Sequence, residues 1–237
     1  MLKGIDISSW QTGIDLSVTM RDLDFCIVKA TEGTAFVETT CDPWIQQLIK
    51  LKKLWGFYHF ARTNEPEDEA SYFVKACKNY FGHGIPVLDT ETGQSGEWCQ
   101  RFVDRVHALT GVWTIVYMSS NTKQRAKFIG TSIPKTCGLW EAFYPDARAI
   151  DFDHIPPYEG GCAPWEFAAL WQFSAYGNLN GFDGAIDLDV AWMDAAAWQR
   201  YARPDTVAPN PEPKPEPELR KWTFENNFVR VTVELKK

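Results

Sequence analysis

Short apolar runs alternate with longer amphipathic segments along much of the chain. Eight runs have the β-branched and aromatic content of strands, and they cover residues 3–8, 25–33, 55–62, 85–91, 113–119, 138–144, 169–174 and 185–190. Apolar residues at helical spacing occur over 43–53, 66–80 and 96–109, and each segment starts with a proline or with clustered acids. The pattern predicts strands and helices in alternation.

Strands that alternate with helices favour parallel β-α units. A chain of 237 residues is long enough for one barrel-sized domain with a substantial core. After residue 130 the helical segments shorten and the strands follow one another more closely. We therefore predict an α/β fold over residues 1–203, an irregular TIM-like (β/α) barrel whose helices are shortened in the second half.

Carboxylates stand near the ends of several predicted strands. The run that starts at Ile85 ends with Asp89 and Glu91. Residues two apart on a strand share one face, about 6–7 Å apart, so these two acids are expected to point into one site. Their environments would separate their pKa values and leave one able to donate a proton, as glycosidic bond cleavage requires. Asp6 and Asp187 are expected at the same mouth, since a barrel gathers its strand ends there.

Six sequence motifs resemble those of the glycoside hydrolase family 25 lysozymes, the muramidases of bacteria, fungi and many bacteriophage endolysins. The motifs are GIDISSWQ, FCIVKATEG, GFYHFAR, PVLDTE, LWQFSAYG and IDLDV, in order over about residues 2–200. The resemblance implies an irregular barrel and an enzyme that hydrolyses the β-1,4 bond between N-acetylmuramic acid and N-acetylglucosamine in bacterial peptidoglycan. It implies no cofactor.

The resemblance also assigns roles to residues. Glu91 would be the general acid, and Asp89 would stabilise the 2-acetamido group of the substrate, which attacks the anomeric carbon so that configuration is retained. Asp6 and Asp187 match the other two cleft acids and would hold this pair in register. The residues expected to bind substrate are Trp10, Lys29, Tyr58, Tyr117, Trp140 and Gln172.

The composition limits the classes of molecule that the chain is expected to bind. The net charge of −7 argues against nucleic acid, and 11 Trp with 8 Tyr favour stacking on sugar rings. The six cysteines contain no C-x-x-C pair and the four histidines no ligand spacing, so no metal site is expected, and Cys26 and Cys77 are expected to be buried thiols. No run suits a signal peptide or a membrane span. We expect either a phage lysin, made in the host cytoplasm and released to the wall or carried in the virion, or a secreted enzyme without its signal.

The C-terminal segment has a different composition. Residues 204–218 are rich in Pro and Glu and predict an extended linker. Residues 219–237 contain two alternating apolar runs around Glu225-Asn226-Asn227, which favours a short β-hairpin. An isolated hairpin is marginal in water, so it would pack on the barrel, self-associate, or be part of a wall-binding module.

Two other functions compete with the muramidase. A chitinase or N-acetylglucosaminidase also uses acids at a strand end, but family 18 chitinases carry a longer acidic repeat, where this chain has Ile85 and Val87. A non-catalytic virion component that binds cell-wall glycan is the alternative from another class.

Overall fold

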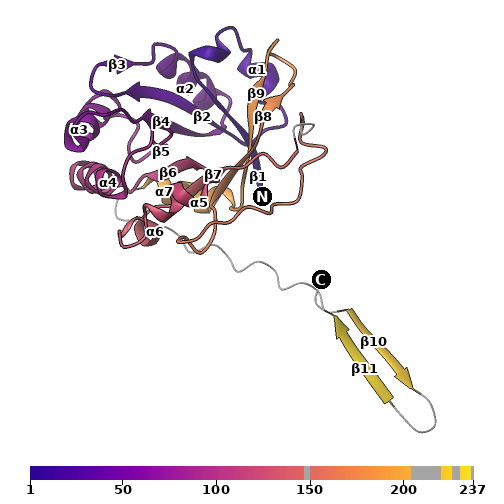
Figure 1. Cartoon of the computed structure of the whole chain (residues 1–237). Coiled ribbons are helices and arrows are strands. Elements are labelled where there is room, and N and C mark those ends of the chain that lie inside the picture. The colour runs from indigo at the N-terminus through magenta and orange to yellow at the C-terminus, as the bar shows by residue number, and fades with distance from the viewer. Residues whose placement is uncertain (147–149, 204–219, 226–229, 236–237) are drawn as a thin grey trace.

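Eight strands close into a barrel in the computed structural model, which describes residues 1–146, 150–203, 220–225 and 230–235 (Figure 1). The barrel strands are β1 (Leu2–Ile7), β2 (Phe25–Glu32), β4 (Leu54–Phe60), β5 (Ile85–Asp89), β6 (Ile115–Ser119), β7 (Leu139–Ala142), β8 (Leu170–Gly177) and β9 (Ile186–Ala191). A further short strand, β3 (Phe36–Val37), pairs with β2 outside the ring. The predicted α/β barrel is confirmed.

The direction of one strand differs from the prediction. Strands β1, β2, β4, β5, β6, β7 and β8 pair in parallel around the ring, but β9 is antiparallel to both β8 and β1. A parallel crossover needs a dozen or more residues, and residues 178–185 are too few to carry the chain back to the other end of the barrel. The expectation of parallel units is therefore wrong for β9, which begins at the mouth where the other strands end.

Helices pack around the barrel, and the two after residue 130, of 4 and 8 residues, are shorter than the helices of 10, 11 and 15 residues between residues 41 and 110, as predicted. The helices are α1 (Leu16–Thr19), α2 (Cys41–Lys50), α3 (Pro66–Ala76), α4 (Gly96–Thr110), α5 (Thr122–Ala126), α6 (Ile133–Thr136) and α7 (Ala195–Ala202), with a 3-10 turn η1 (Ser9–Gln11). Local signals set their ends. The Ser95 hydroxyl accepts the Trp98 N–H at 3.1 Å to start α4, and Gly111, at φ 72°, ends it.

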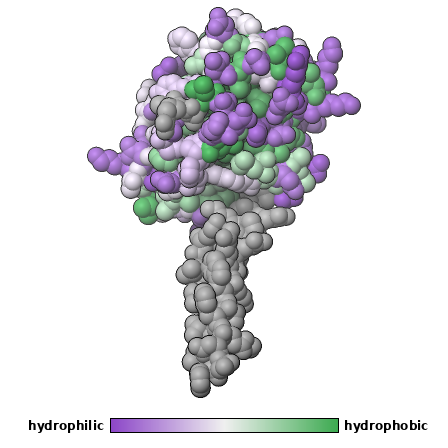
Figure 2. Space-filling view, turned by 90° about the vertical axis from the view of Figure 1, so that its right-hand side faces the viewer, coloured by the Kyte–Doolittle hydropathy of each residue, from purple (hydrophilic) through white to green (hydrophobic). Residues whose placement is uncertain are grey.

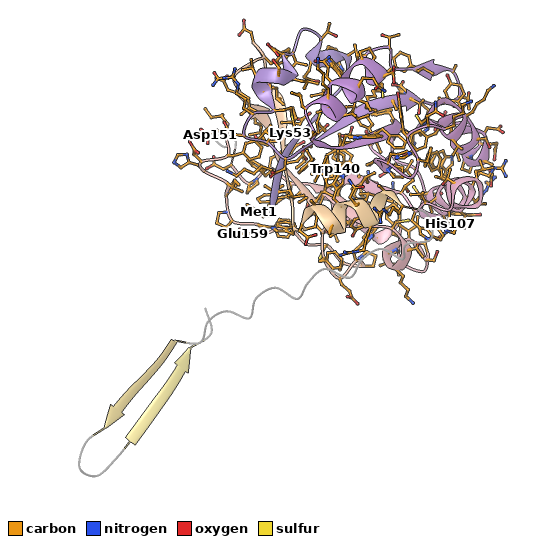
Figure 3. All side chains as sticks on the ribbon, turned by 180° about the vertical axis from the view of Figure 1, so that it is seen from behind. Met1, Lys53, His107, Trp140, Asp151 and Glu159 are labelled. Atoms are coloured by element: carbon orange, nitrogen blue, oxygen red, sulfur yellow. The ribbon has the colours of Figure 1, made fainter. Side chains whose placement is uncertain are left out.

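Alternation along the strands builds two hydrophobic cores. Outward residues such as Ile5 and Val28 pack against the helices. Inward residues such as Phe25 and Ile85 fill the barrel at the end closed by α7, where the Trp198 ring lies 4.6 Å from that of Phe25. Trp140, labelled near the middle of the barrel in Figure 3, belongs to the same inward cluster. Because the apolar inward residues occupy one end, the inward positions at the other end are free for a site.

The outer surface of the barrel shows no single apolar face in the view of Figure 2, where hydrophobic patches are interrupted by hydrophilic side chains. Among the described residues, no helix has the length and apolar character needed to span a bilayer. The thiols of Cys26 and Cys77 are buried, as predicted, and the described residues form no disulfide.

The C-terminal strands β10 (Arg220–Glu225) and β11 (Arg230–Leu235) pair in antiparallel register, with Arg220 opposite Leu235. The predicted linker at 204–218 and the predicted turn at Asn226-Asn227 lie outside the described residues. The division of the chain at residues 203 and 218 stays a prediction.

Candidate active site

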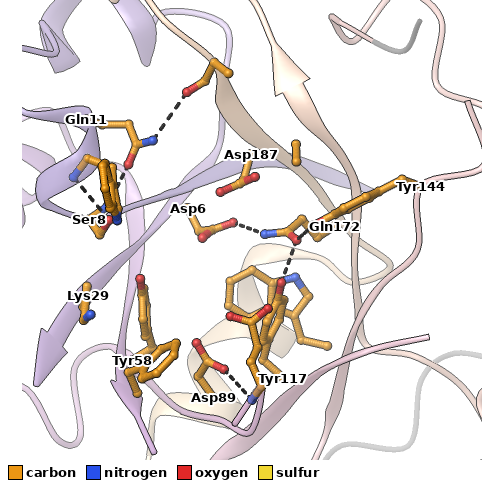
Figure 4. Close-up of a pocket in the computed structure, with 16 residues that line it drawn as sticks. Asp6, Ser8, Gln11, Lys29, Tyr58, Asp89, Tyr117, Tyr144, Gln172 and Asp187 are labelled. Atoms are coloured by element: carbon orange, nitrogen blue, oxygen red, sulfur yellow. Dashed lines mark hydrogen bonds between the residues drawn. The ribbon is translucent and has the colours of Figure 1, made fainter. Parts of the chain in front are cut away.

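A pocket of about 430 Å³ opens at the end of the barrel opposite α7 (Figure 4). All ten residues selected from the sequence line it, namely Asp6, Trp10, Lys29, Tyr58, Asp89, Glu91, Tyr117, Trp140, Gln172 and Asp187. Most occupy inward positions near the carboxyl ends of parallel strands. Asp187 reaches the same mouth because it stands near the start of the antiparallel strand β9.

The two acids of the Asp-x-Glu motif share the pocket, but not by strand alternation. Strand β5 ends at Asp89, and Glu91 lies beyond it in the turn that follows. The Glu91 N–H donates to Asp89 Oδ1 at 3.1 Å, which ties the turn to the strand end. Asp89 is only 5% exposed, whereas Glu91 is exposed at the mouth. The prediction that both acids face one site is correct, and its premise of a continuous strand is wrong.

The surroundings raise the pKa of both carboxyls. Burial, reinforced by the charge of Glu91, raises the pKa of Asp89 well above its usual range. Loss of water contact at the pocket wall raises the pKa of Glu91, and Lys29 opposes that shift. The Lys29 ammonium lies 2.6 Å from Glu32, which also pairs with Arg62 at 2.5 Å. Because Lys29 already pairs with Glu32, its positive charge only partly counteracts the rise in the pKa of Asp89 and Glu91.

Asp6 and Asp187 face each other across the pairing of β1 with β9. Asp6 is buried, and burial together with the charge of Asp187 raises its pKa well above the usual range. Burial and the charge of Glu91 raise the pKa of Asp187 to about 6. The surroundings therefore raise the pKa of all four of these pocket carboxyls, which is the direction that general acid catalysis requires.

Gln172 connects the acids to the aromatic wall. Its amide Nε2 donates to Asp6 Oδ2 at 2.6 Å. Its Oε1 accepts the Tyr117 hydroxyl at 2.8 Å and also accepts the Tyr144 hydroxyl. This network holds Asp6 in one orientation and turns the two phenol rings toward the pocket (Figure 4).

The aromatic residues of the pocket differ in exposure. Trp10 is 89% exposed at the rim, so its ring is free to stack on a ligand. Trp140 is 2% exposed, and its Nε1 donates to Asp189 Oδ1 at 2.9 Å. The exposure of Tyr58 is intermediate, and burial raises the pKa of its hydroxyl. Trp10 and Tyr58 offer surface to a sugar, whereas Trp140 mainly forms the wall.

Sequence reasoning missed part of the site. The additional lining residues are Ser8, Gln11, Phe60, Tyr144, Ala175 and Ala185. Tyr144 stands at the end of the predicted run 138–144, where position alone could have marked it. Asp189 lies under the pocket floor and follows Asp187 by two residues, so strand alternation could have placed it on the same face.

In the part of the chain that is described, no group of three or more His, Cys, Asp or Glu is arranged to hold a metal ion.

Comparison with known proteins identifies the family. The sequence pattern of glycosyl hydrolases family 25 matches residues 5–182. The chain belongs to glycosyl hydrolases family 25. The N,O-diacetylmuramidase of Chalaropsis sp. is 29% identical over 216 residues, which cover 78% of this chain and 96% of that protein.

Solved structures agree with this family 25 fold. The bacterial lysozyme from Streptomyces coelicolor has a TM-score of 0.70 at 23% identity, covering 85% of this chain and 97% of its own. The CTP1L endolysin has a TM-score of 0.62 at 25% identity, covering 81% of this chain and 66% of its own. The family and the fold that the motifs predicted are both confirmed.

Proposed function

We propose that this family 25 glycosyl hydrolase is an N-acetylmuramidase of bacterial peptidoglycan. It would hydrolyse the β-1,4 bond between N-acetylmuramic acid and N-acetylglucosamine. The observation that carries the proposal is the pair formed by buried Asp89 and exposed Glu91 at the end of β5. The names of relatives support the substrate, since they include N,O-diacetylmuramidases from two fungi.

In the proposed mechanism Glu91 protonates the leaving glycosidic oxygen. Its raised pKa favours the protonated form, and its exposure leaves room for the glycan and later for water. Asp89 accepts the N–H of the 2-acetamido group, whose carbonyl oxygen attacks the anomeric carbon. Water then attacks the anomeric carbon and breaks its bond to the acetamido oxygen, and Glu91 takes the proton that the water loses. Two displacements at one carbon retain its configuration.

The remaining pocket residues would bind the glycan. Trp10 and Tyr58 would stack on sugar rings, because they present ring surface at the rim and wall. Tyr117 would shape the floor, and Lys29 and Gln172 would balance charge and hydrogen-bond the substrate. Trp140 would contribute through its position in the wall.

The proposed site of action is the bacterial cell wall, reached as a phage lysin by release from the host cytoplasm or in the virion, or otherwise by secretion. The likeness to the CTP1L endolysin and to a Clostridium acetobutylicum protein named autolytic lysozyme supports action on the wall. The C-terminal strands would add self-association or wall attachment, because residues 229–233 alternate apolar and polar side chains in the sequence.

Digestion of purified peptidoglycan tests the proposal. The products are reduced with borohydride and their new reducing ends are identified by mass spectrometry. We expect reduced N-acetylmuramic acid. Reduced glucosamine ends would identify an N-acetylglucosaminidase, and the absence of any new ends would favour a binding protein.

A further inference from the structure

Asp189 is a buried acid beneath the pocket that the proposed mechanism does not use. It is fully buried on β9 and faces inward like Asp187. Its register partner on β1 is Gly4, which has no side chain. Its Oδ1 accepts the Trp140 N–H, but Oδ2 is buried with no hydrogen-bond partner among the described residues. A buried carboxylate oxygen without a donor is costly, so this atom needs an explanation.

The neighbouring acid, Asp6, explains how this oxygen is satisfied. Asp6 follows Gly4 by two residues on β1, so its carboxyl is the diagonal neighbour of the Asp189 carboxyl on the inward face of the paired strands, and each group acts on the other. An ionised carboxylate only accepts hydrogen bonds, so a bond between two carboxyls requires one proton between them. The other contacts leave room for that proton, because Gln172 Nε2 occupies Asp6 Oδ2 and Trp140 occupies Asp189 Oδ1.

The groups around the pair also favour retention of the proton. The titratable groups that act on these two acids or respond to them are all acidic, namely Asp187, Tyr58, Tyr117, Tyr144 and Cys26. The Lys29 cation acts on Asp89 and Glu91 instead, and Glu32 holds it at 2.6 Å. No cation is among the described groups named as acting on the pair, so two negative charges in this buried space would lack a counter-charge from them.

We propose that Asp189 is a positioning residue that shares one proton with Asp6 across β1 and β9. The shared proton holds the pair at a single negative charge and fixes the Asp6 carboxyl in the pocket that Asp89 and Glu91 also line. It also fixes Trp140 in the pocket wall. The catalytic consequence rests on the proposed muramidase function, but the shared proton itself does not.

Infrared spectroscopy of the full chain without substrate tests the proton directly. Aspartate labelled with carbon-13 identifies the carboxylic acid C=O band near neutral pH. Asp189→Asn and Asp6→Asn should each remove one such band from the wild-type spectrum, because the amide donates to the remaining carboxylate. Asp183→Asn, an exposed acid in the loop before β9, should leave the band unchanged. Wild-type minus Asp189→Asn spectra without a lost acid band would overturn the proposal.

Activity measurements on two variants distinguish a positioning role of Asp189 from a role in packing alone. Asp189→Asn keeps an acceptor for Trp140 and a donor for Asp6, whereas Asp189→Ala keeps neither. We expect kcat/KM of Asp189→Asn to exceed that of Asp189→Ala by at least about tenfold, the factor for losing a hydrogen bond to a charged group. Equal losses in two variants that fold by circular dichroism would contradict the role. If Asp189→Ala does not fold, the infrared comparison still decides, and a failed muramidase assay would leave that comparison untouched.

Discussion

Replacing Asp187 with Asn should stabilise the protein while it lowers activity. Burial and the charge of Glu91 raise the pKa of Asp187 to about 6, against about 3.9 in an unfolded chain. At about 1.4 kcal/mol per pKa unit, the ionised side chain destabilises the fold by about 2–3 kcal/mol at neutral pH. Asn has nearly the same shape and does not ionise, so Asp187→Asn should recover that free energy.

The stability difference between Asp187→Asn and wild type should depend on pH. Below about pH 4 Asp187 is protonated in both the folded and the unfolded chain, so the variant gains nothing. Between about pH 4 and pH 6 the unfolded chain releases its proton first, and wild-type stability falls relative to the variant as pH rises. Above that window the full difference is present.

Urea denaturation of Asp187→Asn and wild type near pH 4 and pH 7 measures this difference. Exposed Asp183→Asn is the matched control and should show no such change. Turnover of Asp187→Asn should fall less than that of Glu91→Gln, because Asp187 supports the acids that do the chemistry. A stability difference that is absent at pH 7, or equal at both pH values, would show that ionisation of Asp187 does not destabilise the folded protein.

Two further predictions concern the scaffold and the tail. Glu141 is fully buried and pairs with Arg125 at 2.6 Å, so Glu141→Ala should lower the free energy of unfolding by about 3–5 kcal/mol in urea titrations. Arg101→Gln, which breaks two exposed pairs, should change it by less than about 1 kcal/mol. Equal losses of stability in these two variants would contradict the expected difference between buried and exposed ion pairs. Deleting residues 205–237 should preserve turnover of soluble glycan fragments and weaken self-association in sedimentation or lysis of intact cells, and loss of turnover on fragments would instead place the tail within the catalytic domain.

Much of the fold could be predicted because local pattern and length determine it. The eight barrel strands lie within a few residues of their predicted positions, and helices α3 and α4 begin at the predicted residues Pro66 and Gly96. The direction of β9 was missed because the rule for strands joined by helices was extended to a connection too short for a helix.

The site was predicted in composition more than in geometry. Asp89 and Glu91 face one pocket, but a backbone hydrogen bond in a turn brings them together rather than strand pleating. The partnership of Asp6 with Asp189 depends on pairing between the first and last barrel strands, which are far apart in the sequence. Periodicity identifies a face of a strand, but barrel closure decides which groups meet on it.

Replacing Glu91 with Gln tests whether Glu91 is the general acid. The variant should fold and bind glycan but cleave peptidoglycan at least about a hundredfold more slowly, the usual scale for loss of a general acid. A glycoside whose leaving group needs no protonation should lose much less, and Glu97→Gln, an exposed Glu in the first turn of α4, should match wild type on both substrates. Near-normal cleavage of peptidoglycan by Glu91→Gln, with an unchanged pH profile, would contradict the assignment of Glu91 as the general acid.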